Sequence, residues 1–163
     1  MGVVYLAGRY SRRLELCAYR DDLERRGHDV PARWLKGNHQ VEGLTAENED
    51  SYTLPADLAT EYALDDLEDI VQSDALVAFT EAPRVGPTRG GRHWEMGFAC
   101  GIRYARWPLS YEPQIYLVGP LENVFTALPI RNTRHADPHA LLDGRYENWS
   151  EFLAALDSGA VTL

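Results

Sequence analysis

Short runs of consecutive apolar residues mark the strands that we expect in this chain. Residues 3–7, 75–79 and 115–118 are almost wholly apolar, and residues 28–31 form a weaker run of the same kind. Unbroken apolar runs of this length are typical of parallel strands that are buried on both faces. A weak final strand is predicted near residues 134–136.

Between these runs, apolar positions recur at the spacing of an α-helix. One such pattern begins after Ser11 and closes at Gly27, a residue type that often ends helices. Further helices are predicted over residues 57–72, around the apolar positions of residues 94–104, and over residues 149–156. Residues 34–56 show no clear period, and an irregular segment of this length is often functional or disordered.

Strands that alternate with helices predict an α/β fold in which helices cover both faces of a parallel sheet. With about five strands, we expect residues 1–163 to form a single domain with a doubly wound, flavodoxin-like sheet. Such sheets bind ligands outside the carboxyl ends of their strands. This rule selects residues 8–13, 80–95 and 119–123 as the candidate site.

Charge and composition narrow the class of ligand. The formal net charge of −9 disfavours a nucleic acid polymer as a partner, because binding to phosphate backbones needs clustered Lys and Arg, but it leaves small anionic substrates open. No apolar run approaches the length of a membrane span, and an apolar strand pattern begins at once, so we expect neither membrane insertion nor a signal peptide. The spacing of a metal site is absent from Cys17, Cys100 and the histidines. We therefore expect both thiols to be reduced, the protein to be cytoplasmic, and no metal or cofactor to be bound.

Glu95 is the first candidate for chemistry. It follows Gly90, Gly91, Arg92 and His93, and the helical pattern predicts that it lies in the first turn of a helix. Free N–H groups and a partial positive charge at a helix amino end favour an ionised carboxylate, as a nucleophile requires. The alternative is that Glu95 is only an acid of the kind that first turns commonly carry.

The acidic run of residues 65–69 holds the second candidate. Most of these acids must form a solvated face, but one of them could point toward the strand ends and act as an acid or base. Spacing alone does not choose between Asp65 and Asp66.

The segment 8–13 (GRYSRR) combines a hydroxyl group, three guanidinium groups and a helix start, which can together hold a phosphate or a sugar hydroxyl. It lacks the pattern of a P-loop and of a dinucleotide fingerprint, and its alternative interpretation is an ordinary turn with surface arginines. Tyr10 and Trp34 could stack on a base, although such aromatic side chains more often belong to the core. His93 is the histidine beside the predicted site, and a structural role is its more common use.

Four ordered segments resemble the nucleoside 2-deoxyribosyltransferases and the related nucleoside 5′-monophosphate N-glycosidases. They are a first strand and loop, a helix with aspartates eight residues apart, a helix containing the candidate nucleophile, and a segment seen in phage and bacterial members. In this chain they are residues 4–8 (VYLAG), 66–75 (DLEDIVQSDA), 91–99 (GRHWEMGFA) and 118–125 (VGPLENVF). The likeness covers nearly the whole chain, with 34–56 matched least.

The resemblance implies that Asp66, rather than Asp65, is catalytic. It also implies that Glu95 attacks C1′ to give a covalent glycosyl-enzyme, while Asp66 takes part in the proton transfer to the departing base. It also implies a homodimer or larger homo-oligomer. Because the two roles need opposite charge states, we expect Glu95 to titrate low or near normal and Asp66 to titrate higher in a dry pocket. The expected substrate-binding residues are Gly8, Arg9, Tyr10, Ser11, Arg12, Trp34, Glu81, Gly91, His93 and Asn123.

Two departures from the family pattern keep several functions open. Where transferases of the family often carry an Asp that contacts the base, this chain has Thr80 or Glu81, and its segment 8–13 holds more arginines than a free nucleoside needs. The leading hypothesis is a deoxyribosyltransferase that acts on nucleosides. Its alternatives are a nucleoside 5′-monophosphate N-glycosidase, a nucleotide-binding module without catalysis, and an unrelated α/β domain whose acids lie on the surface.

Overall fold

The fold is described from a computed structural model of the chain. The description covers residues 1–37, 39, 55–82, 91–107, 109–128, 130 and 141–163. The predicted strand near residues 134–136 and most of the segment 34–56 lie outside these residues.

Four parallel strands form the sheet in the described part of the chain. They are β1 (Val4–Ala7), β2 (Ala75–Phe79), β3 (Gln114–Val118) and β4 (Gly144–Tyr146), in the spatial order β1-β2-β3-β4. An isolated parallel bridge between Val3 and Asp29 adds the segment around Asp29 beside β1. With that bridge counted as the second strand, the order is the 2-1-3-4-5 of a flavodoxin-like sheet, which confirms the predicted fold class.

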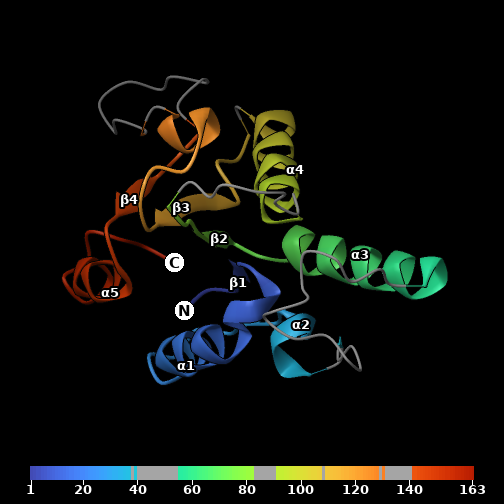
Figure 1. The fold of residues 1–163 in the computed structure, drawn as a ribbon. Coiled ribbons are helices and arrows are strands. Elements are labelled where there is room, and N and C mark those ends of the chain that lie inside the picture. Colours follow the sequence, from blue (N-terminus) through green and yellow to red (C-terminus); the bar gives the residue numbers. More distant parts are fainter. Residues whose placement is uncertain (38, 40–54, 83–90, 108, 129, 131–140) are drawn as a thin grey trace.

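Helices cover both faces of this sheet (Figure 1). On one face, α1 (Arg13–Glu24) and α5 (Trp149–Asp157) meet through stacked rings of Tyr19 and Trp149, whose centroids are 4.6 Å apart. On the other face lie α3 (Ala56–Val71) and α4 (Gly91–Arg106), and the one-turn helix α2 (Arg33–Lys36) contacts both α1 and α3. Two 3₁₀ helices complete the description, η1 (Tyr10–Arg12) and η2 (Val124–Ala127). None of the described helices has the length and apolar character needed to cross a membrane.

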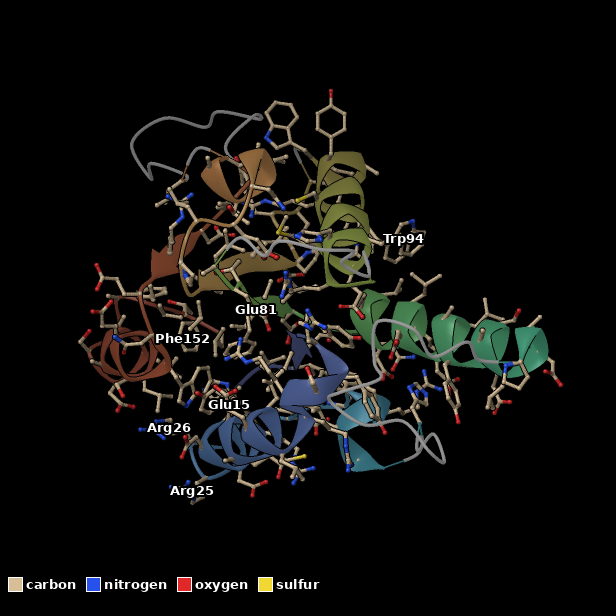
Figure 2. All side chains as sticks on the ribbon, viewed as in Figure 1. Glu15, Arg25, Arg26, Glu81, Trp94 and Phe152 are labelled. Atoms are coloured by element: carbon tan, nitrogen blue, oxygen red, sulfur yellow. The ribbon has the colours of Figure 1, made fainter. Side chains whose placement is uncertain are left out.

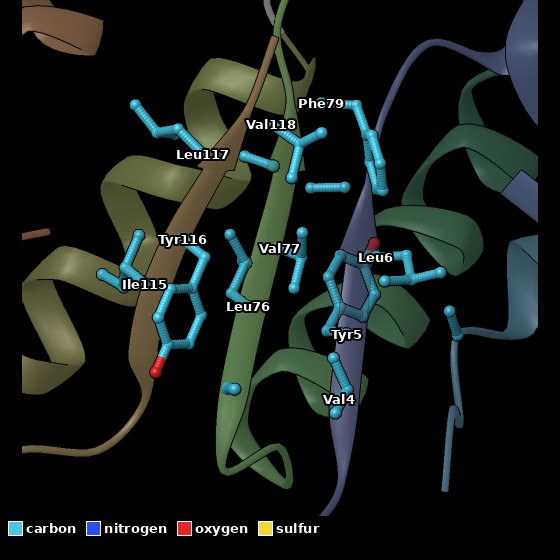
Figure 3. Packing of buried hydrophobic residues seen from close by; sticks show 14 of the residues in the cluster. Val4, Tyr5, Leu6, Leu76, Val77, Phe79, Ile115, Tyr116, Leu117 and Val118 are labelled. Atoms are coloured by element: carbon cyan, nitrogen blue, oxygen red, sulfur yellow. The ribbon is translucent and has the colours of Figure 1, made fainter. Parts of the chain in front are cut away.

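The strands form the centre of the core because their side chains are apolar on both faces (Figure 3). Every residue of β1 and β2 is buried, including Tyr5 and Phe79. Gly8 follows β1 directly, and a Cβ atom there would lie 2.6 Å from Leu16 of α1. A larger residue at position 8 would therefore force the buried side chain of Leu16 to shift.

The apolar runs located β1, β2 and β3 correctly, and the helical periods located α1, α3, α4 and α5 to within a few residues. The run at 28–31 forms only the single bridge at Asp29. The sequence patterns missed α2 and β4, because α2 spans one turn and β4 consists of Gly144, Arg145 and Tyr146, which form no apolar run.

A buried ion pair joins α4 to the residue that directly precedes β4. The side chains of Arg103 and Asp143 are each 4% exposed and are joined by two hydrogen bonds, one of them 3.3 Å from Arg103 Nη2 to Asp143 Oδ1. The Asp143 carboxylate also accepts a 2.8 Å hydrogen bond from the backbone N–H of Ile115 in β3. One carboxylate therefore bonds to both a helix and a strand.

Asp143→Asn should lower the free energy of unfolding by about 3–5 kcal/mol, because it leaves the Arg103 charge buried without its partner. Urea unfolding followed by circular dichroism measures this change. Asp157→Asn, which breaks an exposed pair with Arg26, is the matched control and should leave stability nearly unchanged. Equal effects from both substitutions would contradict the assignment of Asp143 as a structural anchor.

Candidate active site

Two carboxyl groups and one phenol meet between the sheet and the helices of one face. The hydroxyl of Tyr5, in β1, donates a 3.2 Å hydrogen bond to Glu95 Oε1, in α4. Asp66, in α3, is close enough for its charge to act on both of the other groups. Glu95 Oε2 and Asp66 Oδ1 are buried and have no hydrogen-bond partner among the described residues. Three segments distant in sequence thus supply one polar cluster.

Arg33 pairs with the other acids of the run 65–69. Its guanidinium group lies 2.8 Å from Asp65, 2.8 Å from Glu68 and 2.9 Å from Asp69, and its backbone N–H donates to Asp69 at 2.8 Å. Asp66 is the member of the acidic run that takes no bond from Arg33 among those described. Asp66 is therefore the acid of this run whose charge acts on Glu95.

Burial dominates the titration of the two carboxyl groups. Desolvation, followed by the charge of Asp66, raises the pKa of Glu95 to about 8, although the Tyr5 hydrogen bond and the charge of Arg92 lower it. Desolvation likewise raises the pKa of Asp66 to about 6, with the charge of His39 opposing it. A carboxylate that loses water without gaining enough hydrogen bonds is less stable than its acid.

Two expectations about Glu95 were therefore wrong. The helix begins at Gly91, so Glu95 is its fifth residue, and its first turn carries no acid. The carboxylate is beyond the free N–H groups of the amino end, and burial outweighs the remaining helix field. As a result, the pKa of Glu95 is raised further from its ordinary value than that of Asp66, the reverse of the predicted order.

A second polar cluster lies where β2 and β3 end. Its centre is Glu122, which pairs with the buried guanidinium of Arg92 and lies 3.6 Å from Nε2 of His93. The same histidine nitrogen lies 2.8 Å from the side-chain nitrogen of Asn123, and the backbone N–H of Glu81 donates to Glu122 at 3.5 Å. The predicted residues Glu81, His93 and Asn123 are thus brought together by Glu122.

The turn after β1 reaches the same cluster through Arg9, whose guanidinium lies 3.8 Å from Glu81 Oε2. Arg12 forms a two-bond ion pair with Glu15, at 2.7 and 2.8 Å, so its charge already has a partner. Tyr10 lies against a cation as well, since the guanidinium carbon of Arg13 is 5.8 Å from its ring centre. Ser11 is exposed beside them.

Trp34 occupies a different place from the one predicted. It is only 6% exposed, and its indole N–H donates a 3.1 Å hydrogen bond to the backbone carbonyl of Leu6. A ring that is packed in the core with its polar atom satisfied presents no face on which a base could stack. The structure therefore excludes Trp34 from the stacking role.

The sequence patterns did not single out Tyr5, Arg92 or Glu122. Tyr5 lies inside an apolar run, which predicts a core residue. Its hydroxyl nevertheless needs a hydrogen-bond partner once it is buried, and this need could have indicated a polar group nearby. Arg92 and Glu122 are ordinary charged residues in sequence. Their pairing depends on the parallel order of β2 and β3, which no local pattern contains.

A cavity of about 390 Å³ lies at the opposite ends of the strands. Its lining includes Gly2, His28, Asp29 and Asp74, but neither Glu95 nor Asp66. The candidate site rests on the buried carboxylates and their partners, which this cavity does not contain.

Comparison with known proteins does not identify the function of this chain. No protein-family model matches the chain, and no curated protein matches it either. Among solved structures, one described as the Clostridium botulinum CMP N-glycosidase BcmB is similar at 21% identity and a TM-score of 0.45, over 95% of this chain and 98% of that chain. A likeness of this size carries no argument about function.

The raised pKa values predict how stability depends on pH. Both groups bind protons more tightly in the folded protein than in the unfolded chain. The stability that they contribute is therefore fully present below the unfolded pKa values near 4. It is lost as the pH rises through about 6 for Asp66 and about 8 for Glu95. Glu95→Gln should therefore flatten the decline between pH 6 and 8 and raise stability at pH 8 by a few kcal/mol at most, on the order set by such shifts. Urea unfolding across this range measures it.

Glu61→Gln removes an exposed carboxyl group on α3 and serves as the control for this comparison. It should leave the slope of stability against pH unchanged. A wild-type protein whose stability rises between pH 6 and 8 would contradict the burial of an uncompensated carboxyl group at position 95.

Proposed function

We propose that this protein cleaves the N-glycosidic bond of a nucleoside or nucleotide, with Glu95 as the nucleophile and Asp66 as the acid. The observation that carries the proposal is the meeting of two buried carboxyl groups at Tyr5, between β1 and the helices α3 and α4. Acids with strongly perturbed pKa values cluster at functional sites. The resemblance of the four sequence segments assigns the two roles.

The reaction needs one proton to be shared between the two carboxyl groups. Between pH 6 and 8 the two groups together hold one proton. The higher pKa of Glu95 places this proton mainly on Glu95, so the reactive form is the less populated one, in which Asp66 holds the proton. In that form Glu95 is a carboxylate that can form a bond to C1′ while the C1′–N bond breaks and its electron pair leaves with the base. The base takes the proton from Asp66, and Tyr5 holds the attacking carboxylate by its hydrogen bond.

An acceptor then removes the sugar from Glu95. If a second base attacks C1′, the protein is a 2-deoxyribosyltransferase; if water attacks, it is an N-glycosidase that releases free base. Both outcomes proceed through two displacements and retain the configuration at C1′. Transfer to a base is the leading form of the proposal, and hydrolysis of a 5′-monophosphate is its alternative.

The second polar cluster supplies the groups for holding the substrate. Asn123, His93 and Glu81 offer donors and acceptors at the strand ends, where doubly wound sheets bind their ligands. Arg9 is the cation of the first loop that reaches this cluster, through its contact with Glu81. We assign the sugar and base edges to these residues and a 5′-phosphate, if the substrate carries one, to the segment 8–13.

A product assay by chromatography tests the proposal. The protein is incubated with deoxynucleosides and nucleoside 5′-monophosphates, each with and without a second free base. A new nucleoside formed only with the added base identifies the transferase, and free base from monophosphates alone identifies the hydrolase. Glu95→Gln should reduce either activity by on the order of 10³-fold or more, because an amide is a poor nucleophile.

Glu68→Gln, on the Arg33 side of α3, is the control and should keep most of the activity. Tight binding of a nucleotide without release of base from any substrate would instead favour the non-catalytic binding module. Retention of full activity by Glu95→Gln would remove Glu95 from the mechanism.

The proposal extends to a homo-oligomer formed through the outer face of α4. Trp94 and Tyr104 are 60% and 63% exposed there, and the Trp94 ring stacks on Phe98 at 5.6 Å (Figure 2 shows Trp94 projecting from the helix). Gly97 and Gly101 lie on the same helix with open space where a side chain would be, so a second copy of α4 can approach closely. The same helix carries Glu95.

Trp94→Glu should therefore convert a dimer into a monomer, because it places a charge in an apolar contact. Size-exclusion chromatography with light scattering measures the mass. Leu14→Glu, at an exposed apolar residue of α1, is the matched control and should leave the mass unchanged. A wild-type protein that is monomeric at all concentrations tested would rule out the oligomer.

A further inference from the structure

His39 is a buried histidine with carboxylates at both of its ring nitrogens. Its side chain is 5% exposed, Nε2 lies 3.2 Å from Asp65 Oδ2, and Nδ1 lies 3.6 Å from Asp66 Oδ1. The ring also stacks on Tyr62, with the centroids 4.2 Å apart and the planes at 20°. The imidazole is therefore held in orientation by one acid and one ring while its other nitrogen faces the proposed catalytic acid.

A neutral imidazole cannot suit both of these carboxylates at once. It has one N–H donor and one lone pair, so one ring nitrogen would turn a lone pair toward a negative oxygen. The conflict is relieved in two ways: the ring gains a proton, or Asp66 keeps its own. Asp66 Oδ1 lacks a hydrogen-bond partner among the described residues, so the group that faces it has a direct influence on its state.

We infer that His39 is a positioning residue that controls, through Nδ1, whether Asp66 carries a proton. A protonated ring stabilises the Asp66 carboxylate, and a neutral ring leaves Asp66 as an acid that can give its proton to the departing base. This inference rests on the proposed function for the role of Asp66. The contact itself is independent of any activity.

Other charges around the pair do not replace this influence. Asp65 is shared between His39 and Arg33, which fixes the far nitrogen of the ring. On the inner side, Asp66 is faced by Tyr5 and Glu95, and along α3 by Asp65 and Asp69. Burial is the main cause that raises the pKa of Asp66, and among the surrounding groups His39 is the charge that opposes it.

The test follows the carboxyl carbon of Asp66 by ¹³C NMR as a function of pH, with the signal assigned by its loss in Asp66→Asn. His39→Gln is the main variant, because its amide can keep the contact with Asp65 while the charge is removed. The pKa of Asp66 should rise above the wild-type value of about 6 by about one unit, the size expected when a nearby opposite charge is lost. An unchanged pKa of Asp66 would overturn the inference.

Two further variants keep the test decisive. His39→Asn places a neutral amide near the position of Nδ1 and should also raise the pKa of Asp66, so it stands in if the Gln variant fails to fold. His28→Gln is the control, because His28 contacts Gly2 beyond the amino end of β1 and should leave Asp66 unaffected. An equal rise in His28→Gln would show that the effect is not specific to His39.

The activity assay separates this inference from the proposed function. If base is released, the pH window of kcat should move upward in His39→Gln by the same amount as the pKa of Asp66, with KM little changed. A loss of activity at all pH values without such a movement would mark His39 as structural only. If no substrate releases base, the proposed function fails, while the NMR titration still decides whether His39 acts on Asp66.

Discussion

The carboxyl groups of Glu95 and Asp66 are buried away from solvent where α3 and α4 face the sheet. Ionising either group there therefore costs free energy. The surrounding groups reduce that cost only in part: Tyr5 donates one hydrogen bond, and Arg92 and His39 contribute charge. The raised pKa values follow from this shortfall. A nucleophile and an acid can then exchange one proton within the range of neutral pH.

Elsewhere among the described residues, two groups of charged side chains are paired. Arg103 and Asp143 satisfy each other between α4 and β3, and Arg33 gathers three acids of α3 into one network. The same helix therefore carries acids that are paired with Arg33 and one acid, Asp66, that is not. This contrast, rather than the number of acids, distinguishes the candidate site from an ordinary solvated face.

The sequence was sufficient for the fold class, but not for the environment of the candidate acids, whose roles stay predictions. Apolar runs specify buried strands directly, and parallel strands bring their carboxyl ends together, so Glu95 and the acids of α3 were placed near one another. The pKa order failed because burial of a carboxyl group depends on the packing of α3 against α4. Trp34 was misassigned since an aromatic residue in an irregular segment gives no sign of which carbonyl its indole will meet. The single domain, the oligomer and the cytoplasmic location stay predictions.

The three groups of the carboxylate cluster come from a strand at the amino end of the chain, a helix in the middle and a helix beyond the second strand. Tyr5 and Glu95 are separated by 90 positions, and their hydrogen bond crosses from the sheet to a covering layer. No excised fragment and no partly detached helix could preserve this arrangement. The site is therefore a cooperative property of the assembled layers, and its chemistry should vanish together with the global transition rather than fade segment by segment.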